Sequence, residues 1–270
     1  MNDYNEYKEL NLFEVANQDT DCQISHSNSN IKLYNDDCMN VLKQMQDSSV
    51  DLIVTDPPYL IYNAKRKNID TELKYSLGKL YTELNTANIV NGYDIELFGK
   101  EFIRVMKNIN IYIWCNKLQI PDYLSFYVNK YGCNFDILCW HKSNALPTYS
   151  NKYLTDTEYL LYFRKGKGKC FPKSYDDAKT YYIAPINQSN KKVYMHPTIK
   201  PLSITERIIR NSSEENDVVL DPFMGSGTTG VACKHLHRNF IGVELNKQYF
   251  DIAQRRIDEC QICKYLPYLK

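Results

Sequence analysis

The residues best suited to chemistry form a short turn, Asp56-Pro57-Pro58-Tyr59, directly after an apolar run. Its two prolines fix φ and remove two N–H donors, which predicts a stiff turn with outward-facing carbonyl oxygens. The Asp56 carboxylate and the Pro57 carbonyl could each accept one N–H of an exocyclic amine such as adenine N6, stabilising the positive charge that develops when the nitrogen is alkylated. Tyr59 offers a flat face on which an extruded base could stack. The turn therefore predicts alkylation of an amino group on a base.

A second turn is rich in glycine. Gly225, Gly227 and Gly230 have the G-x-G-x-x-G spacing and follow the apolar run Val218–Asp221. Such a turn lets the backbone approach a nucleoside cofactor closely, and Glu244 ends the next apolar run, where it could bind ribose hydroxyls. We therefore expect a nucleoside-cofactor site around this turn.

Two features favour one nucleoside cofactor over another. In dinucleotide-binding proteins the glycine turn usually comes early and further strands follow it, but here only 26 residues follow Glu244. Asp221 directly precedes the turn, and its carboxylate would repel a pyrophosphate but suits the ammonium of an amino-acid moiety. S-adenosylmethionine therefore fits the turn better than NAD.

The chain alternates short apolar runs with helical patterns, which is typical of a mostly parallel sheet covered on both faces. We predict an α/β, Rossmann-like fold with a seven-stranded sheet. The predicted strands are Ile31–Tyr34, Asp51–Thr55, Ile111–Cys115, Phe135–His141, Glu158–Arg164, Val218–Asp221 and Phe240–Glu244. The predicted helices are Cys38–Met45, Tyr93–Lys107, Ile120–Tyr131, Pro201–Asn211, Thr229–His235 and Gln248–Ile257.

Three segments depart from this alternation. Residues 1–30 are polar and predict an N-terminal arm ahead of a single catalytic domain, residues 31–270. Residues 61–92 are polar and too long for an ordinary connection, which predicts a mobile functional loop. Residues 165–195 lack a clear period and hold much of the basic charge, so we expect a small target-recognition insertion there.

Composition places the chain among soluble globular proteins, with 43% apolar and 24% charged residues. No run of about 18 apolar residues and no basic segment followed by an apolar run occurs, which predicts a cytoplasmic protein without a membrane partner. The nine cysteines lack a framework spacing, and Cys260-x-x-Cys263 is half of a zinc site with no second pair nearby. No metal is predicted.

At these two turns the chain resembles the β class of S-adenosylmethionine-dependent DNA amino-methyltransferases, which modify adenine N6 or cytosine N4. In that class the catalytic motif precedes the cofactor motif, a circular permutation of the methyltransferase sheet. The resemblance runs from about Ile31 to Ile257, and Asp221-Pro222-Phe223-Met224-Gly225-Ser226-Gly227-Thr228-Thr229 matches the cofactor loop residue for residue. It implies a site-specific DNA adenine-N6 methyltransferase that acts on a flipped adenine in DNA.

The resemblance also implies roles for single residues. Asp37 would contact the cofactor's adenine, Lys200 would approach the cofactor carboxylate, and Trp140-His141-Lys142 resembles the segment beside the target-base pocket. The implied catalytic residues are Asp56, Pro57, Pro58 and Tyr59. The implied cofactor-binding residues are Asp37, Lys200, Asp221, Phe223, Gly225, Ser226, Gly227, Thr228 and Glu244.

Two departures from the family pattern concern the DNA contacts. Asn108-Ile109-Asn110 replaces the usual proline and glycines, and only about thirty residues separate the strand ending at Arg164 from His196. Such a short target-recognition region leaves room for the N-terminal arm or a homodimer to supply further contacts. A cognate restriction endonuclease is a further partner that the resemblance leaves open.

Basic residues supply the expected contacts to DNA phosphates. Between residues 140 and 200, eleven Lys or Arg stand against four Asp or Glu, a local charge of +7 in a chain whose total is +1. Such a block is typical of a polyanion-binding surface, which gives salt-dependent affinity. A second basic group follows the Asp56 turn. The predicted DNA-binding residues are Lys65, Arg66, Lys67, Lys142, Arg164, Lys165, Lys167, Lys169 and Lys173.

Several other functions remain open at this stage. A cytosine-N4 methyltransferase of the same fold is the nearest rival, although that group more often has serine where this chain has Asp56. A methyltransferase acting on RNA or on a protein amide, a catalytically silent DNA-binding module and an NAD-dependent oxidoreductase are weaker alternatives. The acids at Asp56, Asp221 and Glu244 argue against a silent module.

Overall fold

The computed structural model describes residues 30–59, 93–147, 151, 153–186 and 199–260. Its strands are β1 (Ile31–Tyr34), β2 (Leu52–Thr55), β3 (Asn110–Cys115), β4 (Asn134–Lys142), β5 (Thr157–Arg164), β6 (Tyr181–Ala184), β7 (Val218–Asp221) and β8 (Asn239–Val243). Its helices are α1 (Cys38–Gln44), α3 (Ile95–Val105), α4 (Ile120–Tyr123), the π-helical η1 (Leu124–Lys130), α5 (Tyr175–Ala178), α7 (Leu202–Ser212), α8 (Thr228–His235) and α9 (Lys247–Asp258).

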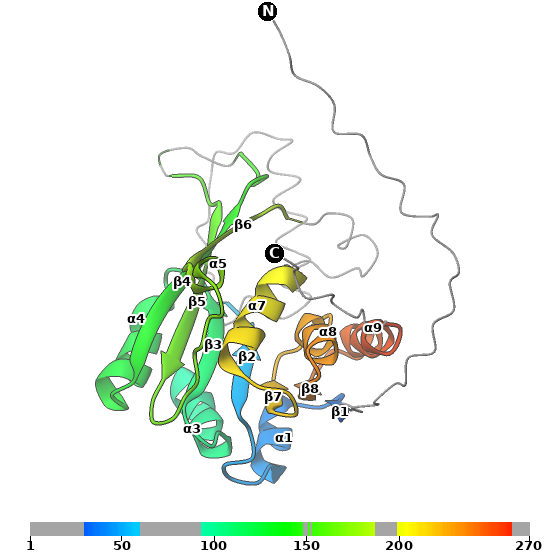
Figure 1. Ribbon diagram of the computed structural model, residues 1–270. Helices are drawn as coiled ribbons and strands as arrows, with labels where there is room; N and C mark the ends of the chain where they lie inside the picture. The colour runs from blue at the N-terminus through cyan, green and yellow to red at the C-terminus, as the bar shows by residue number, and fades with distance from the viewer. Residues whose placement is uncertain (1–29, 60–92, 148–150, 152, 187–198, 261–270) are drawn as a thin grey trace, which may run out of the picture.

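The strands form one sheet in the order β1-β8-β7-β2-β3-β5-β4-β6 (Figure 1). Only β5 is antiparallel to its neighbours; the other described pairs are parallel. This arrangement confirms the predicted α/β fold with a mostly parallel, Rossmann-like sheet.

Two strands distant in the sequence lie side by side at the centre of the sheet. β2 pairs with β7 in parallel, with Leu52 opposite Val219 and Ile53 opposite Leu220. Because the pairing is parallel, the turns that follow the two strands emerge at the same edge, which we call the carboxyl edge. The early catalytic turn and the late glycine turn therefore meet there.

Helices cover both faces of the sheet, and the strand side chains alternate between them. In β2, Leu52 and Val54 join the hydrophobic cluster that includes α7, α8 and α9, whereas Ile53 joins the cluster that includes α1, α3 and η1. A strand buried on both faces needs apolar residues at every position. This explains why the central strands appear in the sequence as continuous apolar runs.

The prediction of seven strands was wrong by one. β6 pairs in parallel with the outer edge of β4, with Tyr182 opposite Trp140, inside the segment 165–195 that showed no period. It is four residues long, and Tyr182 is its one buried side chain. An edge strand this short leaves too few alternating residues to give a recognisable pattern.

The remaining predicted elements are present, with ends that differ by one or two residues. The predicted helix over residues 120–131 begins as α4 and continues as η1, and the single-turn α5 was not foreseen. None of the helices in the described ranges combines the length and apolarity that crossing a bilayer requires. The predicted arm (except residue 30) and the predicted loop 61–92 lie outside the described residues.

At Gly227 the backbone of α9 lies close to the glycine turn. Its φ is +80°, and a Cβ added there would lie 3.0 Å from the Cα of Ala253. Gly132 also has positive φ, +66°, but a Cβ there would meet only the Lys165 Nζ at 3.8 Å. We predict that Gly227→Ala lowers the free energy of unfolding by about 2–3 kcal/mol and Gly132→Ala by about 1 kcal/mol, since only the former adds a backbone contact to the conformational strain.

Urea unfolding of the two variants, without any cofactor, measures this difference. Equal losses for the two glycines would show that the approach of α9 does not constrain the turn.

Candidate cofactor and target-base site

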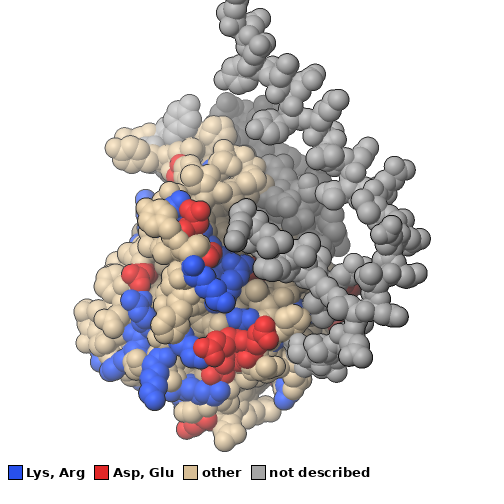
Figure 2. Space-filling model, in the orientation of Figure 1, with Lys and Arg blue, Asp and Glu red and all other residues tan. Residues whose placement is uncertain are grey.

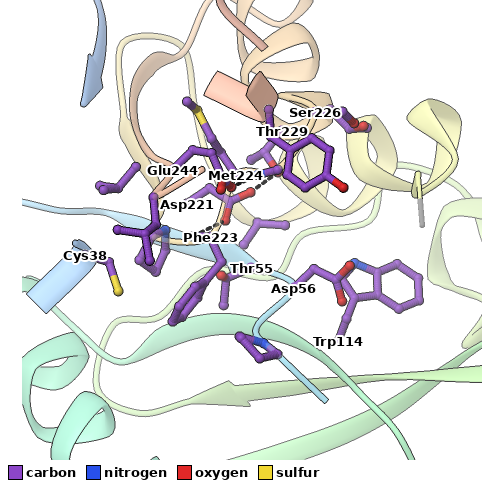
Figure 3. Close-up of a pocket in the computed structure, with 18 of the residues that line it drawn as sticks. Cys38, Thr55, Asp56, Trp114, Asp221, Phe223, Met224, Ser226, Thr229 and Glu244 are labelled. Atoms are coloured by element: carbon purple, nitrogen blue, oxygen red, sulfur yellow. Dashed lines mark hydrogen bonds between the residues drawn. The ribbon is translucent and has the colours of Figure 1, made fainter. Parts of the chain in front are cut away.

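A cavity of about 490 Å³ opens at the carboxyl edge of the sheet. Asp56, which follows β2, and Asp221, the last residue of β7, both line it (Figure 3). Its size is that of small-molecule sites, and its position is where open α/β sheets bind their ligands. The structure thus brings the two sequence-predicted turns to one cavity.

The glycine turn forms one wall of the cavity and is held by two side chains from elsewhere in the chain. The Gly225 N–H donates to Glu244 Oε2 at 3.0 Å, and Arg256 Nη1 donates to the Ser226 carbonyl at 3.1 Å and to Thr228 Oγ1 at 3.0 Å. Gly225, Ser226 and Thr228 line the cavity. Gly227 does not, so its contribution is the close packing of α9 described above.

Asp221 places a buried carboxylate in the same wall. It is 3% exposed, accepts from Thr229 Oγ1 at 2.6 Å and accepts from the Phe223 N–H at 3.1 Å (Figure 3). Burial raises the pKa of Asp221 to about 7 despite these two bonds. Its hydrogen-bond donors among the described residues are neutral groups. This carboxylate suits a cationic group in the cavity.

Two further carboxylates stand among apolar side chains that suit a nucleoside. Asp37 caps α1 by accepting from the Met39 N–H at 2.8 Å, and Glu244 accepts from the Asn246 N–H at 2.8 Å. Burial raises the pKa of Glu244. Carboxylates bind hydroxyl and amino groups, and apolar walls bind a flat ring. The apolar neighbours that line the cavity include Cys38, Phe98, Phe223 and Val243.

The catalytic turn contributes Asp56 and Pro58 to the cavity lining, whereas Pro57 and Tyr59 do not line it. The Asp56 Oδ2 atom forms an ion pair with Lys200 Nζ at 2.7 Å. The Asp56 Oδ1 atom is buried and accepts no hydrogen bond from the described residues. A buried acceptor without a donor is costly, and a ligand N–H in the cavity would satisfy it.

Lys200 lines the cavity, but it is engaged differently from the expectation. Its ammonium lies 2.7 Å from Asp56 Oδ2 and 3.0 Å from Glu158 Oε2, and it donates to the Tyr59 hydroxyl at 3.1 Å. The described polar contacts of Lys200 are thus with the catalytic turn and with Glu158. The contact with the cofactor carboxylate that the family resemblance implies stays a prediction.

Five of the predicted DNA contacts are not brought to the cavity. β5 is antiparallel, so Arg164 and the residues after it emerge at the amino edge: Arg164 pairs with Asn110, the first residue of β3. Asp56 lies about four residues further along the strand direction, or roughly 13 Å. Arg164, Lys165, Lys167, Lys169 and Lys173 therefore lie away from the catalytic turn, and their contact with DNA stays a prediction.

Three of these basic residues have side-chain partners at the amino edge. Arg164 is ion-paired with Asp136, Lys165 Nζ donates to the Tyr131 carbonyl, and Lys169 forms an ion pair with Glu214 at 3.2 Å. Figure 2 shows Lys and Arg side chains gathered over the lower part of one face, beside a group of acidic side chains. Their local neutralisation leaves less positive charge for a polyanion than the sequence count implied.

The other predicted contacts fall into two groups. Lys142 lies at the carboxyl edge, but it forms an ion pair with Glu158 at 2.6 Å and its side chain is only 15% exposed. Lys65, Arg66 and Lys67 lie outside the described residues. Within the described ranges, no group of three or more His, Cys, Asp or Glu residues is arranged to hold a metal ion.

Several residues of the site were not foreseen. Glu158 is an acidic residue at the start of an apolar strand. A charged residue is rare in such a strand unless it is paired, so this position could have been recognised as a candidate site residue. Arg256 and the aromatic lining residues lie within ordinary amphipathic or apolar patterns that do not distinguish them from core residues. The unforeseen lining residues include Cys38, Tyr93, Phe98, Trp114, Thr205, Thr229, Asn246 and Tyr249.

Known proteins resemble the chain in both sequence and fold. A family model described as DNA methylase, covering N6 and N4 methyltransferases, matches residues 50–255. The Type II methyltransferase M2.MboI of Moraxella bovis is 31% identical over 85% of this chain and 88% of its own length. The crystal structure of the M1.HpyAVI–SAM complex is 29% identical, with a TM-score of 0.58 over 84% of this chain and 99% of that one.

A third likeness concerns the fold alone. The cytosine-N4-specific PvuII DNA methyltransferase is 18% identical and superimposes with a TM-score of 0.64 over 84% of this chain and 86% of its own. The M1.HpyAVI structure was solved with S-adenosylmethionine. The cavity fits it, because buried carboxylates stand ready for an ammonium and for hydroxyl groups beside apolar walls.

The buried Asp221 carboxylate predicts opposite effects on stability and on binding. Its folded pKa, about 7, lies above the unfolded value, so its contribution to stability is present below about pH 4 and lost as pH rises through 7. Asp221→Asn should therefore raise the stability of the cofactor-free protein by about 1–3 kcal/mol at pH 8, and by less at pH 5. The same change should weaken S-adenosylmethionine binding at least tenfold, since it removes the partner of a cation.

Thermal unfolding at both pH values and titration calorimetry measure these effects, with the exposed Asp122→Asn as control. A variant that loses stability at pH 8, or that binds the cofactor as tightly as the natural protein, contradicts the assignment.

Proposed function

We propose that this chain, which belongs to the N6/N4 family of DNA methylases, transfers the methyl group of S-adenosylmethionine to the N6 amino group of adenine in DNA. The observation that carries the adenine assignment is Asp56: a carboxylate occupies the first position of the catalytic turn, where the cytosine-N4 members more often have serine. Its Oδ1 atom lies at the same cavity as Asp221 and Glu244, with no donor among the described residues.

The adenine amine is a weak nucleophile because its lone pair is delocalised into the ring. A carboxylate that accepts one of its N–H bonds favours the tetrahedral nitrogen and stabilises the positive charge that develops on it. S-adenosylmethionine, when bound, supplies an electrophilic methyl group on a sulfonium. The amine nitrogen would take this methyl group as the carbon–sulfur bond breaks, and it would lose its extra proton afterwards to the Asp56 carboxylate or to water, so Asp56 would act as a hydrogen-bond acceptor rather than as a strong base beforehand.

Three carboxylates of the cavity would hold the cofactor. Asp221 would pair with the ammonium of the amino-acid part, Glu244 would accept from the ribose hydroxyls, and Asp37 would accept from the adenine amino group. The glycine turn, which Glu244 and Arg256 hold in place, would let the backbone approach closely. These side chains position the methyl donor, and positioning supplies much of the rate enhancement.

The DNA would approach at the carboxyl edge. Asp56 is recessed, with its side chain only 23% exposed, so a base in a duplex could reach it only by leaving the stack. The described residues at that edge include Ser143 and Asn144, after β4, and Ile186, after β6; Asn144 Oδ1 accepts from the Ile186 N–H. Proximity to the cavity favours this edge over the amino edge for the contacts nearest the target base.

Removing the Asp56 carboxylate should stop the reaction without emptying the cofactor site. We predict that Asp56→Ala and Asp56→Asn each lower the methyl-transfer rate by at least about 10³-fold, because alanine offers no acceptor and an amide oxygen stabilises the cationic nitrogen less than a carboxylate does. Cofactor affinity should change by less than about threefold. Transfer of labelled methyl groups to duplex DNA, together with calorimetry, measures both, and Asp122→Ala serves as the matched control.

The identity of the product tests the adenine assignment separately. Nucleosides from DNA modified by the natural chain should contain N6-methyladenine and no N4-methylcytosine when analysed by mass spectrometry. N4-methylcytosine alone would overturn the adenine assignment and leave the DNA methyltransferase intact.

A further inference from the structure

Four ionised side chains of alternating sign lead from the surface of the carboxyl edge to the catalytic carboxylate. Lys142 pairs with Glu158 Oε1 at 2.6 Å, Glu158 Oε2 with Lys200 at 3.0 Å, and Lys200 with Asp56 Oδ2 at 2.7 Å. We call this series Lys142–Glu158–Lys200–Asp56 the ion-pair chain. Its members come from four separate segments, so only the folded sheet assembles it.

The antiparallel strand β5 makes the ion-pair chain possible. Because β5 runs against its neighbours, its first residues lie at the carboxyl edge, and Glu158 stands opposite Trp140 of β4. A parallel strand would have placed the same residue at the amino edge, away from the cavity. The reversal of this one strand thus delivers a carboxylate to the site.

Lys200 is held tightly in this arrangement. Its side chain is 6% exposed, and its ammonium lies 5.2 Å from the ring centre of Trp114 and 5.3 Å from that of Tyr59. Aromatic faces attract a cation that has lost its water, and the two carboxylates fix its direction. A flexible lysine is therefore confined to one place, against the catalytic carboxylate.

The charges along the ion-pair chain affect one another strongly. Burial raises the pKa of Asp56, and the Lys200 ammonium is the largest influence that opposes this rise. The pKa of Glu158 lies at about 2, because Lys200 and Lys142 outweigh the effect of its burial. Without Lys200, two carboxylates would share a buried site and compete for one proton.

We propose that Lys200 is a positioning residue for methyl transfer: it holds Asp56 as a carboxylate, engages its Oδ2 atom and leaves Oδ1 for the target amine, while Glu158, backed by Lys142, fixes Lys200 in place. The proposal rests on the proposed role of Asp56 as the acceptor. It differs from a role for Lys200 as a ligand of the cofactor carboxylate, because the described polar contacts of its ammonium are with Asp56, Glu158 and Tyr59.

A set of substitutions separates the two roles. Lys200→Met keeps the length of the side chain and removes its charge, and Lys200→Arg keeps the charge. The double variant Lys200→Met with Glu158→Gln removes the cation together with the competing carboxylate. The matched control is Lys107→Met, which breaks a lysine–aspartate pair with Asp51 near the opposite end of β2.

In Lys200→Met the acid limb of the kcat–pH profile should move to higher pH by at least one unit, because Asp56 then ionises less readily. At pH 7, kcat should fall at least tenfold, with S-adenosylmethionine affinity within about threefold of the natural chain. The double variant should move the acid limb back toward lower pH, Lys200→Arg should retain part of kcat, and Lys107→Met should change neither quantity. A cofactor affinity at least tenfold weaker with an unmoved acid limb would overturn the proposal.

A second measurement needs no methyl transfer and so separates this proposal from the proposed function. In Lys200→Met one of the two buried carboxylates, Asp56 or Glu158, should have a raised pKa in the folded state. The melting temperature of the variant should therefore fall further below that of the natural chain as pH rises from 5 to 8. The double variant should lose part of this dependence, because Asp56 stays buried but no longer competes with Glu158 for one proton. The same pH dependence in the single and double variants would refute the ion-pair chain, even if the natural chain methylates DNA; a natural chain inactive on DNA would instead refute the proposed function alone.

Discussion

The parallel pairing of β2 with β7 is the constraint on which the rest of the molecule depends. It brings the ends of an early strand and a late strand to one edge of the sheet, where Asp56 and Asp221 line the same cavity. The apolar runs that form these strands are buried on both faces, so a shift of register would exchange side chains between the two hydrophobic clusters and disrupt the packing of both. The packing energy of the sheet therefore also fixes the geometry of the site.

The electrostatics of the cavity follow from how each buried carboxylate is compensated. Asp56 has an internal counter-ion, Lys200, which is the one lysine or arginine among the described lining residues. Asp221 accepts only neutral hydrogen bonds among the described residues, and its pKa rises to about 7. One carboxylate thus has its counter-ion within the protein, and the other is left for the cation of a ligand. This division matches a reaction in which a cationic donor alkylates a neutral amine.

Most of the fold could be predicted because its central strands and helices carry strong local patterns. The two turns could also be predicted, since prolines and glycines at these positions indicate backbone conformations that other residues rarely adopt. β6 escaped prediction because it is a four-residue edge strand with one buried side chain. The ion-pair chain could not be predicted because its members lie far apart in the sequence, and the contact between them depends on the reversed direction of β5.

The predicted DNA contacts show the limit of counting charges along the sequence. Lys165, Lys167 and Lys169 follow Arg164 closely, but an antiparallel strand carries them to the amino edge, where acidic groups and backbone carbonyls engage several of them. Net charge over a window says nothing about the direction in which a strand leaves the sheet. Lys142, only one strand away, reaches the carboxyl edge and joins the ion-pair chain instead.

A crystal structure of the chain with duplex DNA and an unreactive analogue of S-adenosylmethionine would test the account most directly. The account predicts the amino nitrogen of an extruded adenine within hydrogen-bonding distance of Asp56 Oδ1, and the analogue's ammonium against Asp221. A target amine held by other residues, or an analogue bound away from the glycine turn, would contradict it.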